Sequence, residues 1–222
     1  MKEAVLGTLG TKAILGNHDY HWSKTPTGDP LAQRVEGAKW ALDELKVTER
    51  YHSFDAGGWR FLMLDSVAWE NRGYHAELDA PQVEWLKAEL ARTPKTMPIL
   101  VNSHISIFGA CGFNEPKTLK GDPKNGHWEI PTGWMHADAL AIKEMFKGHG
   151  NVRLCLSGHM HQLDDVTLAG TRYLCAGAIS GNWWTSNRYF DTDRGFVVAD
   201  LHPDGKVETQ YVSYDGAPSL RL

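Results

Sequence analysis

The stretch LCLSGHMH, residues 154–161, decides our interpretation of the fold, because a short apolar run leads directly into a turn with two histidines. The same arrangement occurs twice earlier, in AILGNHD at 13–19 and in ILVNSH at 99–104. Short apolar runs bounded by turns are typical of buried strands. Loops that follow strands at one rim of a sheet can bring distant residues into one site. The three turns therefore predict a shared site rich in imidazole.

The donor atoms of these turns suit a transition metal. Asn17 offers an amide oxygen, and His104 and His159 offer nitrogen, a mixture that fits Mn, Fe, Zn or Ni better than Ca. His159 and His161 are two residues apart, so in extended backbone both would face one cluster. This spacing excludes two ligands on one helical face, as in the HExxH zinc motif. One such turn alone usually marks only a polar loop; it is the set of three that favours a metal centre.

Hydrophobic periodicity outside the turns predicts strands alternating with helices, and then a run of strands. This order is typical of an α/β sandwich of two sheets. The segment 105–131 has no periodicity and is expected to be a functional loop, with His127 and His136 solvated in or beside it. Helices are expected at 31–46, 80–92 and 135–147, and strands at 51–54, 59–64, 97–101, 152–156, 165–168, 172–175, 195–201 and 207–214 and in the segment ending at Leu15.

Composition and charge narrow the function classes. The chain has 222 residues and is 42% hydrophobic, which suits one domain spanning 1–222. The formal net charge of -4 offers no basic patch for a nucleic-acid backbone. No apolar run reaches the length of a membrane span, and the N-terminal stretch fits the fold better than a targeting signal. We therefore expect no nucleic-acid or membrane partner and, by default, a cytoplasmic location.

The motifs resemble those of a known family. Gly16-Asn17-His18-Asp19, the His104 turn and Gly158-His159-Met160-His161 are similar to the third, fourth and fifth motif blocks of the calcineurin-like metallophosphoesterases. The segments WRFLMLDS (59–66) and QVEWL (82–86) are similar to its cyclic-nucleotide phosphodiesterase-like branch. The resemblance extends over most of the chain. It implies an α/β fold of the metallophosphoesterase type, a four-layer α/β/β/α sandwich of two mixed sheets with a dinuclear metal centre at their loops.

The resemblance also implies roles for the turn residues. Asn17, His104 and His159 would bind one metal ion and His161 the other. His18 would contact the phosphate and protonate the leaving oxygen, a task that suits histidine because its ordinary pKa lies near neutral pH. In such a centre two metals lower the pKa of a bridging water, which attacks phosphorus in line with the leaving group.

Five further residues are weaker candidates. Asp19 would orient the neighbouring imidazole, although a turn-stabilising role fits equally well. Asp65 would support the metal site from outside its ligand shell. His21, Trp183 and Trp184 would line the substrate pocket, with the tryptophans stacking on a base or an aromatic leaving group. For the tryptophans, covering the core is the alternative.

Two motif blocks of the family are absent. Family members begin with Asp-x-His and Gly-Asp blocks, which supply a bridging carboxylate, whereas the residues before Gly16 contain Glu3 as their sole acid. Because the remaining ligands are neutral, we expect one or two ions, with the second site incomplete. The resemblance thus implies a sandwich that is N-terminally truncated, without its first strand-helix units. Alternatively, a second copy or a partner completes the sheet, which makes a homo-oligomer possible.

The sequence therefore predicts a metal-dependent phosphoester hydrolase with a small phosphorylated substrate. The substrate is expected to be a phosphodiester, such as a cyclic nucleotide, or a small phosphomonoester. A second enzymatic interpretation is hydrolysis of a pyrophosphate bond in a nucleotide derivative. The alternative from a different class is a non-catalytic or weakly active, truncated phosphoesterase-like domain with an incomplete metal site.

Overall fold

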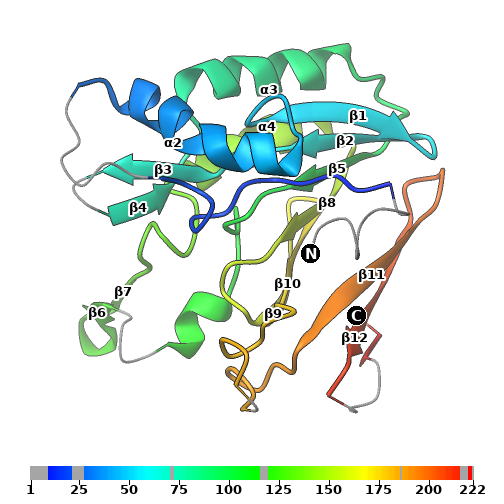
Figure 1. Cartoon of the computed structure of the whole chain (residues 1–222). Coiled ribbons are helices and arrows are strands. Elements are labelled where there is room, and N and C mark those ends of the chain that lie inside the picture. The colour runs from blue at the N-terminus through cyan, green and yellow to red at the C-terminus, as the bar shows by residue number, and fades with distance from the viewer. Residues whose placement is uncertain are drawn as a thin grey trace.

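A six-stranded mixed sheet forms the centre of the computed structural model, which describes residues 10–21, 28–70, 73–115, 120–185, 187–215 and 220–221 (Figure 1). The strand order is β1-β2-β5-β8-β10-β9. The four inner strands run parallel, and each edge strand is antiparallel to its neighbour. The strands are β1 (His52–Ala56), β2 (Trp59–Met63), β5 (Ile99–Asn102), β8 (Val152–Ser157), β9 (Leu163–Leu168) and β10 (Thr171–Ala176).

Among the described residues, three α-helices accompany this sheet: α2 (Pro30–Leu45), α3 (Ala80–Arg92) and α4 (Ala139–His149). Asp29 and Asp79 are the N-caps of α2 and α3, and a proline lies in the first turn of each helix. The local sequence therefore determines where both helices begin. α3 and α4 bury Leu86 and Ile142 in one cluster with the β5 side chains of the central sheet. α2 instead packs with the segment before residue 21, in a cluster that includes Leu15, Ala38 and Ile105.

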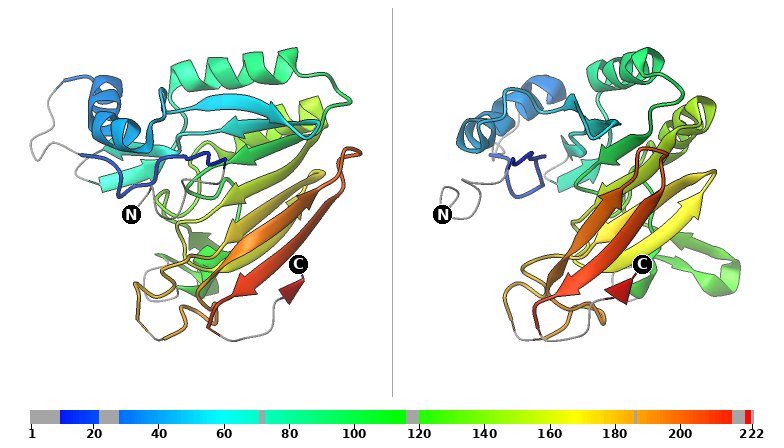
Figure 2. Two further views of the ribbon diagram at one scale, coloured as in Figure 1. Left: turned by 45° about the vertical axis from the view of Figure 1, so that its right-hand side comes forward. Right: turned by 90° about the vertical axis from the view of Figure 1, so that its right-hand side faces the viewer.

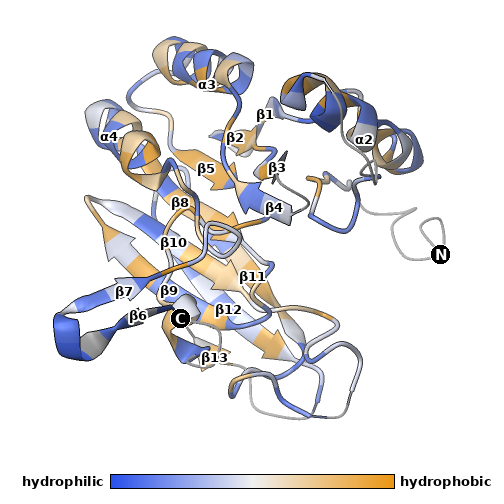
Figure 3. Ribbon diagram, turned by 90° about the vertical axis from the view of Figure 1, so that its left-hand side faces the viewer, coloured by the Kyte–Doolittle hydropathy of each residue, from blue (hydrophilic) through white to orange (hydrophobic). Residues whose placement is uncertain are grey.

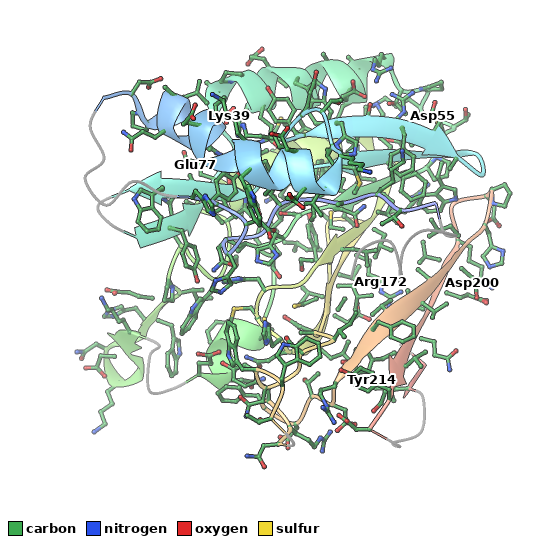
Figure 4. The ribbon with its side chains drawn as sticks, viewed as in Figure 1. Lys39, Asp55, Glu77, Arg172, Asp200 and Tyr214 are labelled. Atoms are coloured by element: carbon green, nitrogen blue, oxygen red, sulfur yellow. The ribbon has the colours of Figure 1, made fainter. Side chains whose placement is uncertain are left out.

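A small antiparallel sheet covers the opposite face of the central sheet (Figure 2). It consists of β11 (Gly195–Leu201), β12 (Val207–Ser213) and β13 (Leu220–Arg221). Apolar side chains of both sheets form the core between them, with Trp59 fully buried and its indole N–H donating to the His202 carbonyl at 2.9 Å. Arg172 on β10 donates to the Thr209 hydroxyl at 2.7 Å and thereby links the two sheets (Figure 4).

Hydropathy follows these layers. Figure 3 shows the inner strands as largely hydrophobic and the outlying hairpin of β6 (Lys120–Asp122) and β7 (His127–Glu129) as hydrophilic. The expected α/β class is confirmed. In the described residues the layers are helices, central sheet and small sheet; no helix in this part of the chain covers the outer face of β11, where Phe196 and Val198 are exposed.

Most expected elements are present close to their predicted bounds, but three local expectations differ. The segment ending at Leu15 was expected to be a strand, yet residues 10–15 have no regular structure, because Leu15 is buried by tertiary packing rather than strand pairing. A hairpin of β3 (Val67–Glu70) and β4 (Gly73–Ala76) was not predicted. The expected loop 105–131 contains the short elements η1 (Cys111–Asn114), β6 (Lys120–Asp122), η2 (Pro123–Asn125) and β7 (His127–Glu129).

Among the described residues, no helix combines the length and apolar character needed to cross a membrane. Glu3, mentioned above as the sole acid before Gly16, lies outside the described residues.

Candidate metal and phosphate site

Two neighbouring parallel strands deliver the second and third histidine turns to one rim of the central sheet. β5 and β8 pair so that Asn102 lies opposite Leu156, and the turns that follow are joined by hydrogen bonds. Ser103 N donates to the Leu156 carbonyl and Gly158 N to the His104 carbonyl, both at 3.0 Å. A β-bulge near the start of the pair, where Val152 lies opposite Ile99 but Leu154 opposite Leu100, sets this register. The expected meeting of these two turns is thereby observed.

Three donor atoms converge at this rim. His104 Nε2 lies 2.9 Å from Asn17 Oδ1 and 3.2 Å from His159 Nδ1. A single ring nitrogen carries at most one proton, so His104 Nε2 cannot satisfy both neighbours by donation. Ligands bound to one cation at about 2.1 Å lie about 3.0–3.4 Å from each other, which is the observed spacing. The donor set therefore fits one divalent transition-metal ion.

Electrostatics keep both imidazoles neutral. Burial, followed by the charges of neighbouring histidines, lowers the pKa of His104 to about 3. Burial is also the main cause that lowers the pKa of His159 to about 4. His18 contributes to both shifts, which places its imidazole close to the pair. At neutral pH the two rings therefore present lone pairs, the state that a metal ligand requires.

The turn with His159 and His161 is not extended, so the expectation that extended backbone directs both rings is wrong. Both residues lie in the left-handed region, with φ of 66° and 56°. Non-glycine residues in this region are strained, and such strain is concentrated at functional sites. The His161 Nδ1–H donates to the Gly181 carbonyl at 2.6 Å, which leaves its Nε2 as the nitrogen with a lone pair.

A cavity of about 350 Å³ opens beside these residues. His18 is exposed on its wall, with its ring 5.6 Å from that of Trp183 in an edge-to-face contact. The cavity thus joins three converging donor atoms to an exposed imidazole. Its lining consists of Asn17, His18, Tyr74, His104, Glu115, Trp134, His159, Met160, His161, Ser180, Trp183, Trp184 and Tyr189.

Comparison with solved structures finds a phosphatase with a similar fold. A purple acid phosphatase from yellow lupin (Lupinus luteus) matches 93% of the chain at 16% identity, with a TM-score of 0.53. The chain spans 38% of that protein. This chain has the metallophosphoesterase fold.

Two further solved structures match this chain with lower TM-scores. A dimetal phosphatase from Danio rerio matches 86% of the chain and 66% of its own length at 14% identity, with a TM-score of 0.44. The anchor GAP50 of the inner membrane complex of Plasmodium matches 79% of the chain and 55% of its own length at 17% identity, with a TM-score of 0.47. No protein-family model matches the sequence. No curated protein matches it either.

Asp19 stabilises the turn in which it lies. Its carboxylate accepts from Gly16 N at 2.7 Å, and its backbone N–H donates to the Gly16 carbonyl at 3.0 Å. This is the turn-stabilising alternative of the sequence analysis, and the carboxylate thereby holds Asn17 in place.

Two candidates lie away from the cavity. Asp65 is fully buried and forms ion pairs with Arg34 and Arg50, so its carboxylate neutralises two guanidinium groups rather than supporting the metal donors. His21 stacks on Trp40 of α2, with ring centroids 5.1 Å apart. The structure thus brings neither residue into the lining, because each already has a strong partner elsewhere.

The two histidines expected to be solvated differ from each other. His127 is exposed on β7. His136 is buried, and its ring nitrogens lie 3.1 Å from the Ser103 hydroxyl and 2.9 Å from the Asp138 carboxylate. The expectation for His136 was therefore wrong, since this side chain ties the residue before His104 to the start of α4.

Sequence reasoning missed much of the aromatic and acidic lining. Glu115 accepts from the Tyr189 hydroxyl at 2.9 Å, and the Tyr74 hydroxyl lies 3.4 Å from His159 Nε2. Glu115 and Tyr189 come from irregular segments, where periodicity carries no signal, and Tyr74 lies on β4, in the hairpin that was not predicted. The prediction of a functional segment at 105–131 was the nearest indication for Glu115. In the part of the chain that the structure describes, no group of three or more His, Cys, Asp or Glu side chains is arranged to hold a metal ion. The Asn17 oxygen is thus needed as the third donor.

Proposed function

We propose that this chain hydrolyses phosphoester bonds of small phosphorylated substrates with the help of a divalent transition metal. The observation that carries the proposal is the spacing of Asn17 Oδ1, His104 Nε2 and His159 Nδ1, at 2.9 and 3.2 Å, beside an exposed His18 in one cavity. The metallophosphoesterase fold supports the same chemistry.

The residues of the site would have separate roles in this reaction. Asn17, His104 and His159 hold one ion of Mn, Fe, Zn or Ni, and the Nε2 of His161 is the donor for a second. A bound ion would polarise a phosphate oxygen and lower the pKa of a bound water. His18 contacts the phosphate and passes a proton to the leaving oxygen.

The proposed substrates include two kinds of phosphoester. The cavity of about 350 Å³ has the size of small-molecule sites. We propose phosphodiesters or small phosphomonoesters as substrates, because both present a phosphate to the histidines and a leaving group to the remaining wall.

Metal analysis together with an assay of hydrolysis tests this function. The chain loaded with Mn²⁺ or Zn²⁺ and dialysed should retain about one equivalent and hydrolyse bis(4-nitrophenyl) phosphate. His18→Ala should lower kcat by about 100-fold or more while the metal stays bound, since general acid catalysis contributes about 10²–10⁴-fold. His104→Ala should lose both metal and activity. His127→Ala, at an exposed histidine on β7, is the matched control. Retained activity in His18→Ala and His104→Ala would contradict the proposal.

A second candidate function is binding of a phosphorylated ligand without turnover. It is favoured by the neutral charge of the three metal donors and by the absence, among the described residues, of a carboxylate-containing metal cluster. Under this alternative, phosphate or a phosphonate binds to the metal-loaded chain, and no ester is hydrolysed beyond the rate of the His18→Ala variant.

A further inference from the structure

Two consecutive tryptophans stand exposed on the wall of the candidate site. Trp183 and Trp184 are 59% and 68% exposed, and both line the cavity that contains His18. Indoles are large apolar groups that a fold normally buries, so an adjacent exposed pair inside a concave site needs an explanation. The alternative that they cover the core does not fit these exposures.

The backbone holds both indoles in a strained conformation. Trp183 and Trp184 have φ of 52° and 66°, in the left-handed region that bulky residues rarely adopt. Trp184 N donates to the Ser180 carbonyl at 2.8 Å, and Thr185 N donates to the Asn182 carbonyl at 3.0 Å. The loop that follows β10 is therefore a hydrogen-bonded turn. Strain that the surrounding structure maintains is characteristic of ligand sites.

This turn is fixed to the histidines that the proposed chemistry uses. The Gly181 carbonyl accepts from His161 Nδ1, and the ring of Trp183 lies 4.9 Å from that of His161 and 5.6 Å from that of His18. The Trp183 indole therefore lies next to the place where a leaving group departs. A planar group on the leaving oxygen would extend along this wall.

The rest of the wall is aromatic as well. The ring of Tyr189 lies 6.1 Å from that of His161, Tyr74 contacts His159 edge to face at 5.6 Å, and Trp134 also lines the cavity. Such a surface binds planar apolar rings by stacking and by edge-to-face contact.

We propose that Trp183 and Trp184 form a stacking surface for the leaving group, so that the substrates of this chain are phosphoesters whose alcohol part carries a planar aromatic ring, including aryl, arylmethyl and nucleoside esters. This specificity rests on the proposed phosphoester hydrolysis. Trp184 is the cleaner residue for a test, because Trp183 also contacts His18 and His161.

The test compares benzyl phosphate with cyclohexylmethyl phosphate. Both are esters of primary alcohols of similar size, so the comparison isolates the aromatic ring. The metal-loaded chain should show a kcat/KM about tenfold higher for the benzyl ester, the size of effect expected from one stacking contact. Trp184→Leu should reduce this ratio to near one, and Trp184→Phe should restore most of it. Trp128→Leu, at a 49% exposed tryptophan on the β6–β7 hairpin, should leave the ratio unchanged.

Binding supplies a readout that does not depend on turnover. Benzylphosphonate should bind the metal-loaded chain about tenfold more tightly than cyclohexylmethylphosphonate in calorimetry, and Trp184→Leu should remove the difference. Equal hydrolysis and equal binding of the aromatic and saturated compounds would overturn the stacking surface while leaving phosphoester hydrolysis intact. No hydrolysis of either ester would overturn the proposed function, and the two phosphonates would then decide the stacking surface alone.

Discussion

The imidazole of His104 lies directly against the backbone of Gly16, with no room for a side chain between them. A Cβ built on Gly16 would lie 2.8 Å from His104 Cε1 and 3.0 Å from each ring nitrogen. The absence of a side chain at residue 16 therefore allows the first histidine turn to reach the second.

Replacing this glycine should weaken metal binding. Gly16→Ala would force the His104 ring away from Asn17, and we expect the metal affinity to fall about 10- to 100-fold, as when groups that orient a ligand are removed. Isothermal titration with Zn²⁺ measures this change. Gly10→Ala is the matched control, because a Cβ at Gly10 meets nothing within 4 Å. An unchanged affinity in Gly16→Ala would show that His104 is not a ligand in the observed position.

Metal binding should also stabilise the folded chain. A ligand that binds only the native state at 100 times its Kd adds about 2.7 kcal/mol to the free energy of unfolding. We therefore expect Zn²⁺ or Mn²⁺ to raise the Tm in calorimetry and a chelator to reverse the rise. His159→Ala should abolish the metal-dependent shift, whereas His127→Ala should keep it. A shift that survives in His159→Ala would place the ion elsewhere.

The buried carboxylate of Asp65 should be essential for stability rather than for catalysis. Asp65 is 0% exposed, and Arg34 Nε donates to it at 2.9 Å while Arg50 pairs with the same oxygen. Asp65→Asn removes one of the two carboxylates that pair with these guanidinium groups, the other being that of Asp79, so the free energy of unfolding in urea should fall by about 3 kcal/mol. Glu36→Gln, which breaks the exposed pair with Lys39, should change it by about 1 kcal/mol or less. A small effect of Asp65→Asn would contradict this assignment.

The pH dependence of stability should include a contribution from Asp138. Burial acts to raise the pKa of this carboxyl, but hydrogen bonds from His136 and from the backbone N–H of Leu78 outweigh it, and the net pKa is lowered. A lowered pKa in the folded state stabilises the protein above the unfolded pKa of about 3.9, and the contribution is lost as the pH falls through the folded value. The difference in unfolding free energy between the natural chain and Asp138→Asn should thus be largest above about pH 5. In urea titrations this difference in unfolding free energy should become smaller as the pH falls toward 3. A difference that does not change with pH would contradict the lowered pKa of Asp138.

The parts of the site that could be predicted are those with a local signal. Apolar runs followed by Asn102-Ser103-His104 and Ser157-Gly158-His159 indicate strands that end at one rim, and β5 and β8 are indeed parallel neighbours. The start of α3 was also predicted, because Pro81 favours the first turn of a helix, and the structure adds Asp79 as the N-cap. In each case the information lies within a few consecutive side chains.

The remaining features depend on tertiary contacts. Leu15 ends an apolar run, yet it is buried beside Ala38 and Ile105, so a strand was wrongly predicted. The left-handed backbone of His159 leaves no trace in residue spacing. Glu115 and Tyr189 meet across 74 positions of the chain, a distance at which no sequence pattern applies.

The extra residue in β8 has a consequence for how the site is specified. Arg153 is the position that the bulge omits from the pairing, and without it each later residue of β8 would face β5 one place out of step. A step along a strand is about 3.3 Å, which is as long as the separation between His104 Nε2 and His159 Nδ1. An insertion or deletion far below the rim, in the first two residues of either strand, would thus be as damaging as the loss of an imidazole. The convergence of the donor atoms at the rim thus depends on the pairing at the other end of β5 and β8.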